Sequence, residues 1–161
     1  MWSDTTKKEE MMKRLTLSSL LIGIVVLATT GYSQMSTDSR YINLPGRTDD
    51  RPFSNAVLAG DTLYLSGKLG IDPATDTLPA SVQEEIRIIL DSMKQRLEMV
   101  GMTMNDLVSV QVFCSDVSLY GEFNAIYRTY FKDHFPARAF IGSGQLLRGA
   151  HFEVMGTAVK R

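Results

Sequence analysis

The hydrophobic positions of the chain predict several short strands. Residues 55–59 and 62–66 are apolar-rich runs separated by Gly60-Asp61, a residue pair typical of a two-residue hairpin turn. The even-numbered residues of 108–114 are apolar and alternate with the residues between them. This alternation is the period of a strand with one buried face.

Two other segments have the helical period. Ser81 and Glu84 have the spacing of a capping box, in which each side chain accepts a hydrogen bond from the other residue's backbone N–H. Apolar residues then recur three and four positions apart through residues 82–100, and Gly101 supplies a left-handed stop. Residues 119–131 repeat apolar side chains at the same spacing, which predicts a second helix.

The rest of the pattern completes one domain. Residues 137–142 and 150–160 are interpreted as strands, and residues 144–149 as the loop between them. The polar residues 35–52 are interpreted as a linker or extended approach to a domain that spans residues 53–161. The predicted order is strand, strand, helix, strand, helix, strand, strand. It indicates an α+β fold, a two-layer sandwich in which two helices cover one face of a mixed sheet.

The other face of such a sheet has no covering layer within the chain. Because a large exposed apolar face is unfavourable in water, we expect this face to be buried against further copies of the chain. The sequence therefore predicts a closed homo-oligomer.

The N-terminal 34 residues have the layout of a secretory signal peptide. Lys13 and Arg14 precede an apolar run, residues 20–28, that small and polar residues follow. The run is shorter than the ~20 residues that span a bilayer, so no stable membrane anchor is expected after the signal is removed. The protein is predicted to be exported, as a periplasmic or secreted protein.

The cleavage point has more than one candidate. Ser33 precedes Gln34 with small residues in suitable positions, and Ala28 with Thr30 offers an alternative. Met11 and Met12 lie directly before the basic pair and are alternative starts. No cysteine lies nearby, so a lipoprotein signal is not expected.

Composition narrows the class of protein. The chain has 161 residues, 44% hydrophobic and 22% charged, which suits one soluble globular domain. Without residues 1–34, 13 basic residues remain against 15 acidic ones, a net charge of −2. No nucleic-acid partner is expected, because phosphate binding favours a basic surface. Cys114 is the single cysteine, and its place on the apolar face of its strand predicts a buried, inert thiol.

Several separated motifs are similar to those of one family. They are Pro52-Phe53-Ser54-Asn55-Ala56, Leu65-Ser66-Gly67, Asn124-Ala125-Ile126-Tyr127, Phe135-Pro136-Ala137-Arg138-Ala139 and Glu153. In this order and spacing they resemble the Rid (reactive intermediate deaminase, YjgF-type) family. The resemblance implies a chorismate-mutase-like fold, a homotrimer with ligand clefts between subunits, and hydrolysis of reactive enamines or imines to 2-keto acids and ammonia.

The resemblance assigns the two chemical roles to Arg138 and Glu153. A guanidinium can hold the carboxylate of a 2-imino acid through two parallel charged hydrogen bonds. A carboxylate can position the attacking water and transfer protons. Without the family motifs, Arg138 would be interpreted as a surface arginine and Glu153 as a solvent-facing strand residue.

Four further residues would line the cleft, by the same resemblance: Phe53, Ser66, Gly67 and Asn124. Phe53 stands where many members have tyrosine, and Lys68 follows Ser-Gly where glutamine is common. The missing phenolic hydroxyl removes one donor from the cleft and leaves the substrate open.

The sequence leaves two classes of function. One is a hydrolytic deaminase of 2-imino acids, and the other is a non-catalytic trimeric protein that binds small carboxylates in its intersubunit clefts. A nuclease activity is disfavoured by the net charge and the signal. His134, His151 and Cys114 have no metal-ligand spacing, and neither a metal nor another cofactor is expected.

Overall fold

The computed structural model describes residues 8–12, 38–47 and 50–161. The chain forms two units, residues 1–36 and 37–161, and residues 8–12 of the first are helical. The predicted signal run, 20–28, and its cleavage sites lie outside the described residues. Of the helices in the described ranges, none is both long and apolar enough to cross a membrane.

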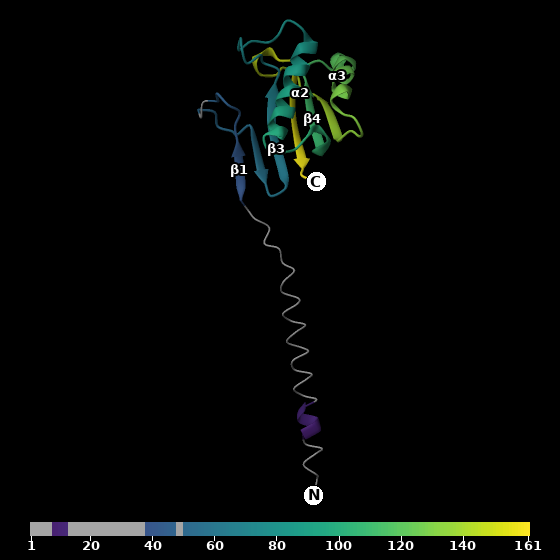
Figure 1. Cartoon of the computed structure of the whole chain (residues 1–161). Helices are drawn as coiled ribbons and strands as arrows, with labels where there is room; N and C mark the ends of the chain where they lie inside the picture. The colour runs from purple at the N-terminus through teal and green to yellow at the C-terminus, as the bar shows by residue number, and fades with distance from the viewer. Residues whose placement is uncertain (1–7, 13–37, 48–49) are drawn as a thin grey trace. The chain divides into compact units, whose positions relative to one another are not determined.

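The second unit is a mixed sheet with helices on one face (Figure 1). Its strands are β1 (Ser39–Ile42), β2 (Ala56–Ala59), β3 (Thr62–Leu69), β4 (Leu107–Cys114), β5 (Ala137–Gly142) and β6 (Phe152–Val159). Its α-helices are α2 (Val82–Glu98) and α3 (Tyr120–Tyr127), and its 3-10 turns are η1 (Met104–Asp106), η2 (Val117–Leu119), η3 (Arg128–Tyr130) and η4 (Leu147–Gly149). The strand order is β1-β2-β3-β6-β4-β5, with β4 and β5 parallel and all other pairs antiparallel. The α+β fold with a mixed sheet is confirmed.

Helix α2 begins and ends as its local sequence predicts. The Ser81 hydroxyl accepts a hydrogen bond from the Glu84 backbone N–H at 3.2 Å, which caps the first turn. Gly101, just past the helix, has a φ of 74°, a conformation that glycine adopts without steric cost. The apolar side of α2, including Ile86, Met93 and Leu97, is fully buried against the sheet.

Aromatic side chains connect α3 to the sheet. The rings of Phe123 in α3 and Phe152 in β6 lie 5.0 Å apart between centroids, and both side chains are fully buried. Phe140 of β5 packs edge-on against Phe123 at 5.6 Å. These contacts join β5 and β6 under one helix, so the core holds the two strands that carry Arg138 and Glu153.

Strand β1 was not predicted as a strand. It lies in the segment interpreted as linker or extended approach, and it pairs with β2 along its whole length. Of its four residues only Ile42 is buried. The sheet therefore begins before Phe53, and an edge strand with one buried side chain has too little alternation to be read from the sequence.

One local expectation was wrong, and two others are confirmed with added detail. Val108 was placed on the buried face of its strand, but it is 42% exposed because the pairing of β4 with β6 shifts at a bulge between Leu107 and Ser109. Leu107 is buried in its place. The predicted helix 119–131 consists of α3 with short 3-10 turns on both sides, and the loop 144–149 contains η4.

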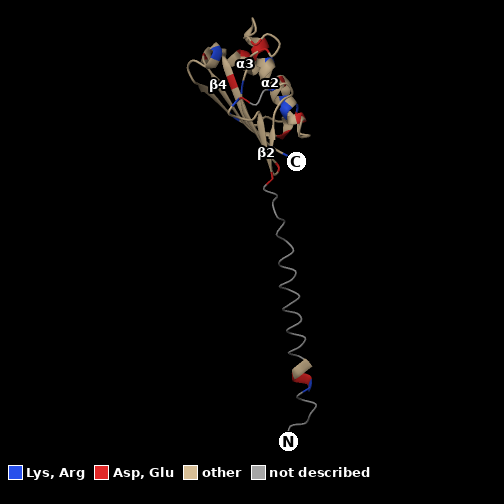
Figure 2. Cartoon of the chain, turned by 90° about the vertical axis from the view of Figure 1, so that its left-hand side faces the viewer, with Lys and Arg blue, Asp and Glu red and all other residues tan. Residues whose placement is uncertain are grey.

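The sheet face opposite the helices is uncovered within the domain. Tyr64, Met155 and Ile141 lie on it and are 54%, 37% and 37% exposed. Figure 2 shows that charged residues gather on the helices and loops, whereas the strands are mostly uncharged. Burial of this face in an oligomer stays a prediction.

Candidate active site

The guanidinium of Arg138 is held by a side chain of α3. Arg138 lies on β5, paired with Val110 of β4, on the face that the helices cover. Its Nη2 donates a hydrogen bond of 2.7 Å to Oδ1 of Asn124 in α3. The structure therefore brings together two predicted site residues that are 14 positions apart in the sequence.

Aromatic rings surround the same guanidinium. The Cζ atom of Arg138 lies 4.7 Å from the ring centroid of Tyr127 and 5.9 Å from those of Tyr120, Phe123 and Phe140. Such contacts stabilise a cation over the ring faces. Burial raises the pKa of Tyr127 to about 12, so this phenol stays protonated at neutral pH. The rings limit the rotamers of Arg138.

A hollow of about 160 Å³ opens beside Arg138. Its lining consists of Asn124, Tyr127, Arg128, Phe135, Pro136 and Arg138. Apart from the arginines the walls are uncharged and largely aromatic. The hollow suits a small carboxylate held by a guanidinium in an apolar wall.

Glu153 lies on the opposite, uncovered face. It pairs with Leu69 of β3 and Phe113 of β4, while its neighbours Phe152 and Val154 point into the core. The side chain is half-buried, and no residue in the described ranges forms a hydrogen bond or ion pair with its carboxylate. This carboxylate is available to a water or a ligand.

Gly67 lies directly under the Glu153 carboxylate. A Cβ at Gly67 would come within 2.2 Å of Oε1 of Glu153, so only glycine allows this approach. Ser66 and Gly67 form an irregularity in β3 where its register with β6 shifts between Leu65 and Lys68. The Ser66 hydroxyl donates to the Asn55 carbonyl at 2.9 Å, so its hydrogen is already engaged.

Phe53 lies on the segment that leads into β2. Its ring is 49% exposed, and the Arg47 guanidinium lies 5.2 Å from the ring centroid. Arg47 also donates a hydrogen bond to the Phe53 carbonyl. Phe53 therefore presents an exposed ring without a polar group.

The two pairs of site residues do not meet within one chain. Arg138 shares its face with Val110, and Glu153 shares the other face with Phe113. They are two strands and three residue positions apart in the sheet, so their Cα atoms lie roughly 14 Å apart at ordinary strand spacings. Within one chain, Arg138 and Glu153 therefore face opposite sides of the sheet.

Two buried charged residues near the site were missed. Glu85 is 2% exposed, and its carboxylate accepts hydrogen bonds from the backbone N–H groups of His151 and Phe152 at 2.8 and 3.0 Å and contacts His151 Nδ1 at 2.7 Å. Arg96 is 1% exposed. Both lie within the apolar arc of α2, and a charged residue inside such an arc is the signal that could have found them.

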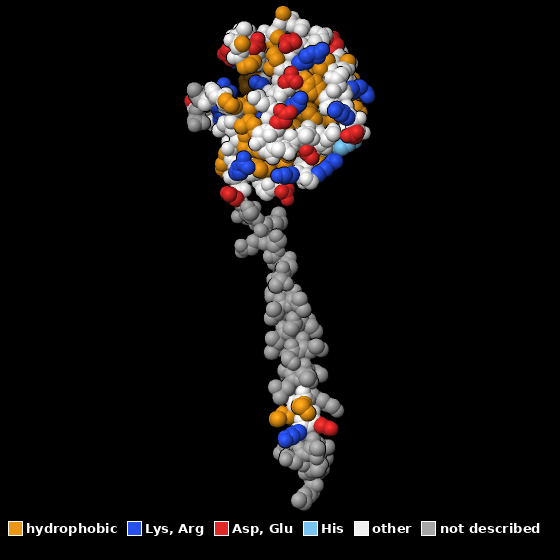
Figure 3. Space-filling view, in the orientation of Figure 1, with side chains coloured by type: hydrophobic (Ala, Val, Ile, Leu, Met, Phe, Trp, Pro, Cys, Tyr) orange, Lys and Arg blue, Asp and Glu red, His pale blue; other side chains and the backbone are white. Residues whose placement is uncertain are grey.

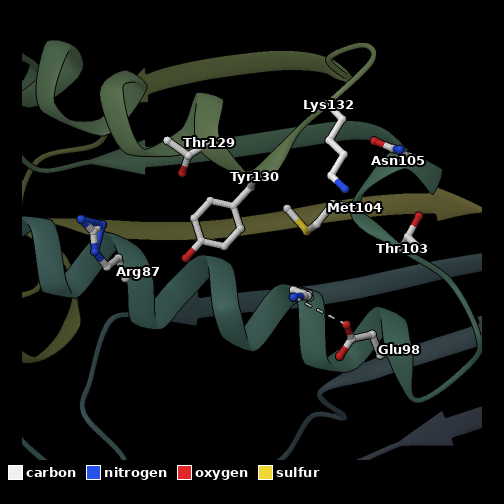
Figure 4. A pocket seen from close by; sticks show the side chains of 9 residues that line it. Arg87, Glu98, Thr103, Met104, Asn105, Thr129, Tyr130 and Lys132 are labelled. Atoms are coloured by element: carbon white, nitrogen blue, oxygen red, sulfur yellow. Dashed lines mark ion pairs between the residues drawn. The ribbon is translucent and has the colours of Figure 1, made fainter.

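A second hollow, of about 560 Å³, lies between α2, the segment that leads into β4 and the segment that follows α3 (Figure 4). Tyr130 and Lys132 point into it, and Lys94 forms an ion pair with Glu98 at 3.8 Å on its rim. It contains none of the predicted site residues. Its charged groups are exposed and of both signs, so it carries no assigned chemistry.

The histidines and the cysteine have structural contacts. His134 Nε2 lies 3.2 Å from the Asn105 carbonyl, and His151 is held by Glu85. Cys114 is buried, and burial raises the pKa of its thiol. In the part of the chain that the structure describes, no three His, Cys, Asp or Glu side chains form a cluster suited to a metal.

Comparisons with known proteins agree with this fold. Residues 48–160 match the family model described as Endoribonuclease L-PSP. The chain therefore belongs to this family, which confirms the resemblance to Rid (YjgF-type) proteins. The mouse protein named 2-iminobutanoate/2-iminopropanoate deaminase is 36% identical over 110 residues, 68% of this chain and 82% of that protein. A RutC family protein of Sulfurisphaera tokodaii is 34% identical over 104 residues, 64% of this chain and 83% of that protein.

Solved structures show the same fold. A structure described as an endoribonuclease from Thermotoga maritima has a TM-score of 0.70 and 33% identity, covering 76% of this chain and 98% of that one. The YjgF gene product from E. coli has a TM-score of 0.66 and 30% identity, covering 74% and 94%. The relatives named deaminases support imine deamination as a function of the family.

Proposed function

We propose that this protein hydrolyses small 2-imino acids to 2-keto acids and ammonia. Water adds to the imine carbon, the C=N bond breaks, and the nitrogen leaves as ammonia with both protons of the water. Arg138 binds the carboxylate of the substrate, and Glu153 positions the water and transfers its protons. The relatives named 2-iminobutanoate/2-iminopropanoate deaminase support this reaction.

The observation that carries the proposal is the fixed orientation of Arg138. Asn124 and the Tyr127 ring hold its guanidinium, and Arg138 lines a hollow of about 160 Å³. A planar guanidinium fixed in this way favours a carboxylate, whose two oxygens match its two parallel N–H groups, over an anion without that planar geometry. The unpaired carboxylate of Glu153 supplies the second chemical group that imine hydrolysis requires.

We propose that the site is completed in a homotrimer. Arg138 and Glu153 occupy opposite faces of one sheet, so a substrate reaches both only when Arg138 of a second protomer approaches Glu153 of the first. The exposed apolar side chains of the uncovered face, such as Met155 and Tyr64, favour association of this kind.

The alternative is a trimeric protein that binds small carboxylates without converting them. Phe53 favours this alternative, because its exposed ring lacks a hydroxyl that could orient a water. The predicted export, as a periplasmic or secreted protein, separates the chain from cytosolic enzymes that release imines, and this separation also favours the alternative.

The test measures ammonia and keto-acid release from freshly generated 2-iminobutanoate. Wild-type protein is compared with Arg138→Lys, which keeps the charge but loses the bidentate fork, and with Glu153→Gln, which keeps the shape but loses the base. We expect release above the spontaneous rate in wild type and a loss of about 100-fold or more in each variant. Release at the spontaneous rate in all three, with calorimetric binding of 2-oxobutanoate that Arg138→Lys weakens, would establish the binding protein instead.

A further inference from the structure

The hollow beside Arg138 is lined by two arginines. Besides Arg138 of β5, Arg128 lies in its wall, directly after the last residue of α3. The Arg128 guanidinium lies over the ring of Phe135, with its Cζ atom 5.8 Å from the ring centroid, and Phe135 lines the same hollow. Two separate cations therefore share a hollow of about 160 Å³.

No carboxylate of the described residues neutralises these two cations. Of the described residues that line the hollow none is acidic, and neither arginine forms an ion pair with a carboxylate in the described ranges. The acids on either side of Arg128 in the sequence, Glu122 and Asp133, accept hydrogen bonds from amide side chains outside the hollow, at 2.6 and 3.2 Å. Figure 3 shows positive and negative side chains mixed over the side of the domain that carries α2, so the hollow differs from its surroundings.

Two uncharged residues of the hollow add hydrogen-bond donors. Oδ1 of Asn124 accepts from Arg138, so its amide N–H groups are the part left to bond. Tyr127 is 3% exposed, and its hydroxyl has no hydrogen-bond partner in the part of the chain that the structure describes. A buried hydroxyl without a partner costs free energy, which an acceptor on a ligand reduces. The hollow therefore suits a ligand with several negatively charged oxygens.

We infer that the substrate is a 2-imino acid that carries a second carboxylate, which Arg128 binds. This inference rests on the proposed function and names its substrate class. Arg138 holds the carboxylate next to the imine carbon, and Arg128 holds the carboxylate at the other end of the carbon chain. A monocarboxylate compensates only one of the two charges, whereas a dicarboxylate compensates both. The hollow is smaller than the roughly 300–1,000 Å³ of pockets for drug-sized ligands, which suits a short carbon chain.

The test compares kcat/KM within pairs of 2-imino acids of equal chain length, one with a second carboxylate and one without. The pairs are 2-iminosuccinate with 2-iminobutanoate, and 2-iminoglutarate with 2-iminopentanoate. Each imine is generated in situ from its amino acid by an amino-acid oxidase. The full chain is used as wild type, as Arg128→Gln, as Arg128→Lys and as the control Arg87→Gln. Arg87 is an exposed arginine of α2 that lines the other hollow.

We expect wild type to prefer the dicarboxylate in at least one pair by about fivefold, the contribution of one partly exposed ion pair. The preference should disappear in Arg128→Gln and persist in Arg87→Gln. Arg128→Lys should retain part of it, because lysine keeps the charge but loses the planar fork. The preference should also weaken at high salt, since the added interaction is electrostatic.

The ratio within each pair separates substrate binding from a structural role of Arg128. Loss of a structural contact would change kcat/KM for both members of a pair alike and leave their ratio unchanged. Turnover of the monocarboxylates with no preference for either dicarboxylate, or with a preference that Arg128→Gln retains, overturns the inference and leaves the proposed function standing.

Failure of the proposed function itself has a different signature. If no imine is hydrolysed above the spontaneous rate, calorimetric titration with 2-oxoglutarate and with 2-oxopentanoate still compares the second carboxylate. Tighter binding of 2-oxoglutarate that Arg128→Gln removes supports Arg128 as its anchor in a binding protein. Equal affinities, or no binding of either acid, overturn it.

Discussion

Replacing Gly67 with alanine places a methyl group in the space that the Glu153 carboxylate occupies. The new Cβ would lie 2.2 Å from Oε1, 2.9 Å from Cδ and 3.2 Å from Cγ of Glu153. All three contacts are with the end of one side chain. The backbone of β3 and β6 can therefore stay in place while the carboxylate moves.

The size of the movement follows from these distances. Because ordinary contacts of a Cβ begin near 3.4 Å, Oε1 must retreat by about 1.2 Å. A displacement of about 1 Å in a catalytic group can cost on the order of 100-fold in rate. We therefore expect Gly67→Ala to lower kcat for imine hydrolysis by about 100-fold. The free energy of unfolding should change by less than about 1 kcal/mol, since alanine is no less favourable than glycine within a strand.

Two other glycines provide matched controls. Gly121, in α3, has no atom within 4 Å of an added Cβ, so Gly121→Ala should keep full activity. At Gly70 the Cβ would meet backbone atoms of Glu85, its carbonyl oxygen at 2.6 Å, so Gly70→Ala should destabilise the fold by about 1 to 3 kcal/mol. Activity and urea denaturation are measured for all three variants. A Gly67→Ala protein with wild-type kcat would refute the reasoning, provided that Glu153→Gln is inactive.

Three further predictions concern stability and assembly. Glu85→Ala leaves the backbone N–H groups of His151 and Phe152 unpaired and should cost about 2 to 5 kcal/mol in urea denaturation, whereas Glu85→Gln should retain most of the stability. The pKa of Tyr127 in the folded state is about 12, above the ordinary value of 10. The neutral Tyr127 phenol therefore contributes about 2 to 3 kcal/mol to the free energy of unfolding. This contribution is full below pH 10 and is lost as the pH rises to 12. Urea denaturation of Tyr127→Phe over the same pH range should lack this loss. A pH dependence identical to that of wild type would contradict the assignment of the loss to Tyr127. Met155→Asp should dissociate the predicted trimer in sedimentation equilibrium, and an unchanged mass would exclude this face as the interface.

Local periodicity was sufficient to predict most elements of the fold. Ser81, the apolar spacing of residues 82–98 and Gly101 define α2 through interactions within a few residues of each other. The hairpin of β2 and β3 follows in the same way from Gly60-Asp61. Strand β1 escaped prediction because its pairing with β2, rather than its own pattern, makes it a strand.

The candidate site was predicted from motifs, and its arrangement was not. Arg138 and Asn124 are 14 positions apart, and only the packing of α3 on β5 brings the guanidinium to the amide oxygen. Gly67 and Glu153 are likewise joined by the register of β3 with β6. Glu85 and Arg96, the two buried charged residues of α2, could be interpreted only once the structure showed the backbone groups that they bond.

The amino-acid sequence by itself determined the helices, most strands, the family and the identity of the candidate chemical groups. Each of these depends on residues close together in the chain or on residue types in a fixed order. The tertiary structure decided that Arg138 and Glu153 face opposite sides of one sheet and that the buried Arg96 of α2 bonds the carbonyls of Asn55 and Ser66. Side-chain alternation tells only which residues of one strand share a face. Which face of one strand meets which face of another is set by register, bulges and packing between distant segments.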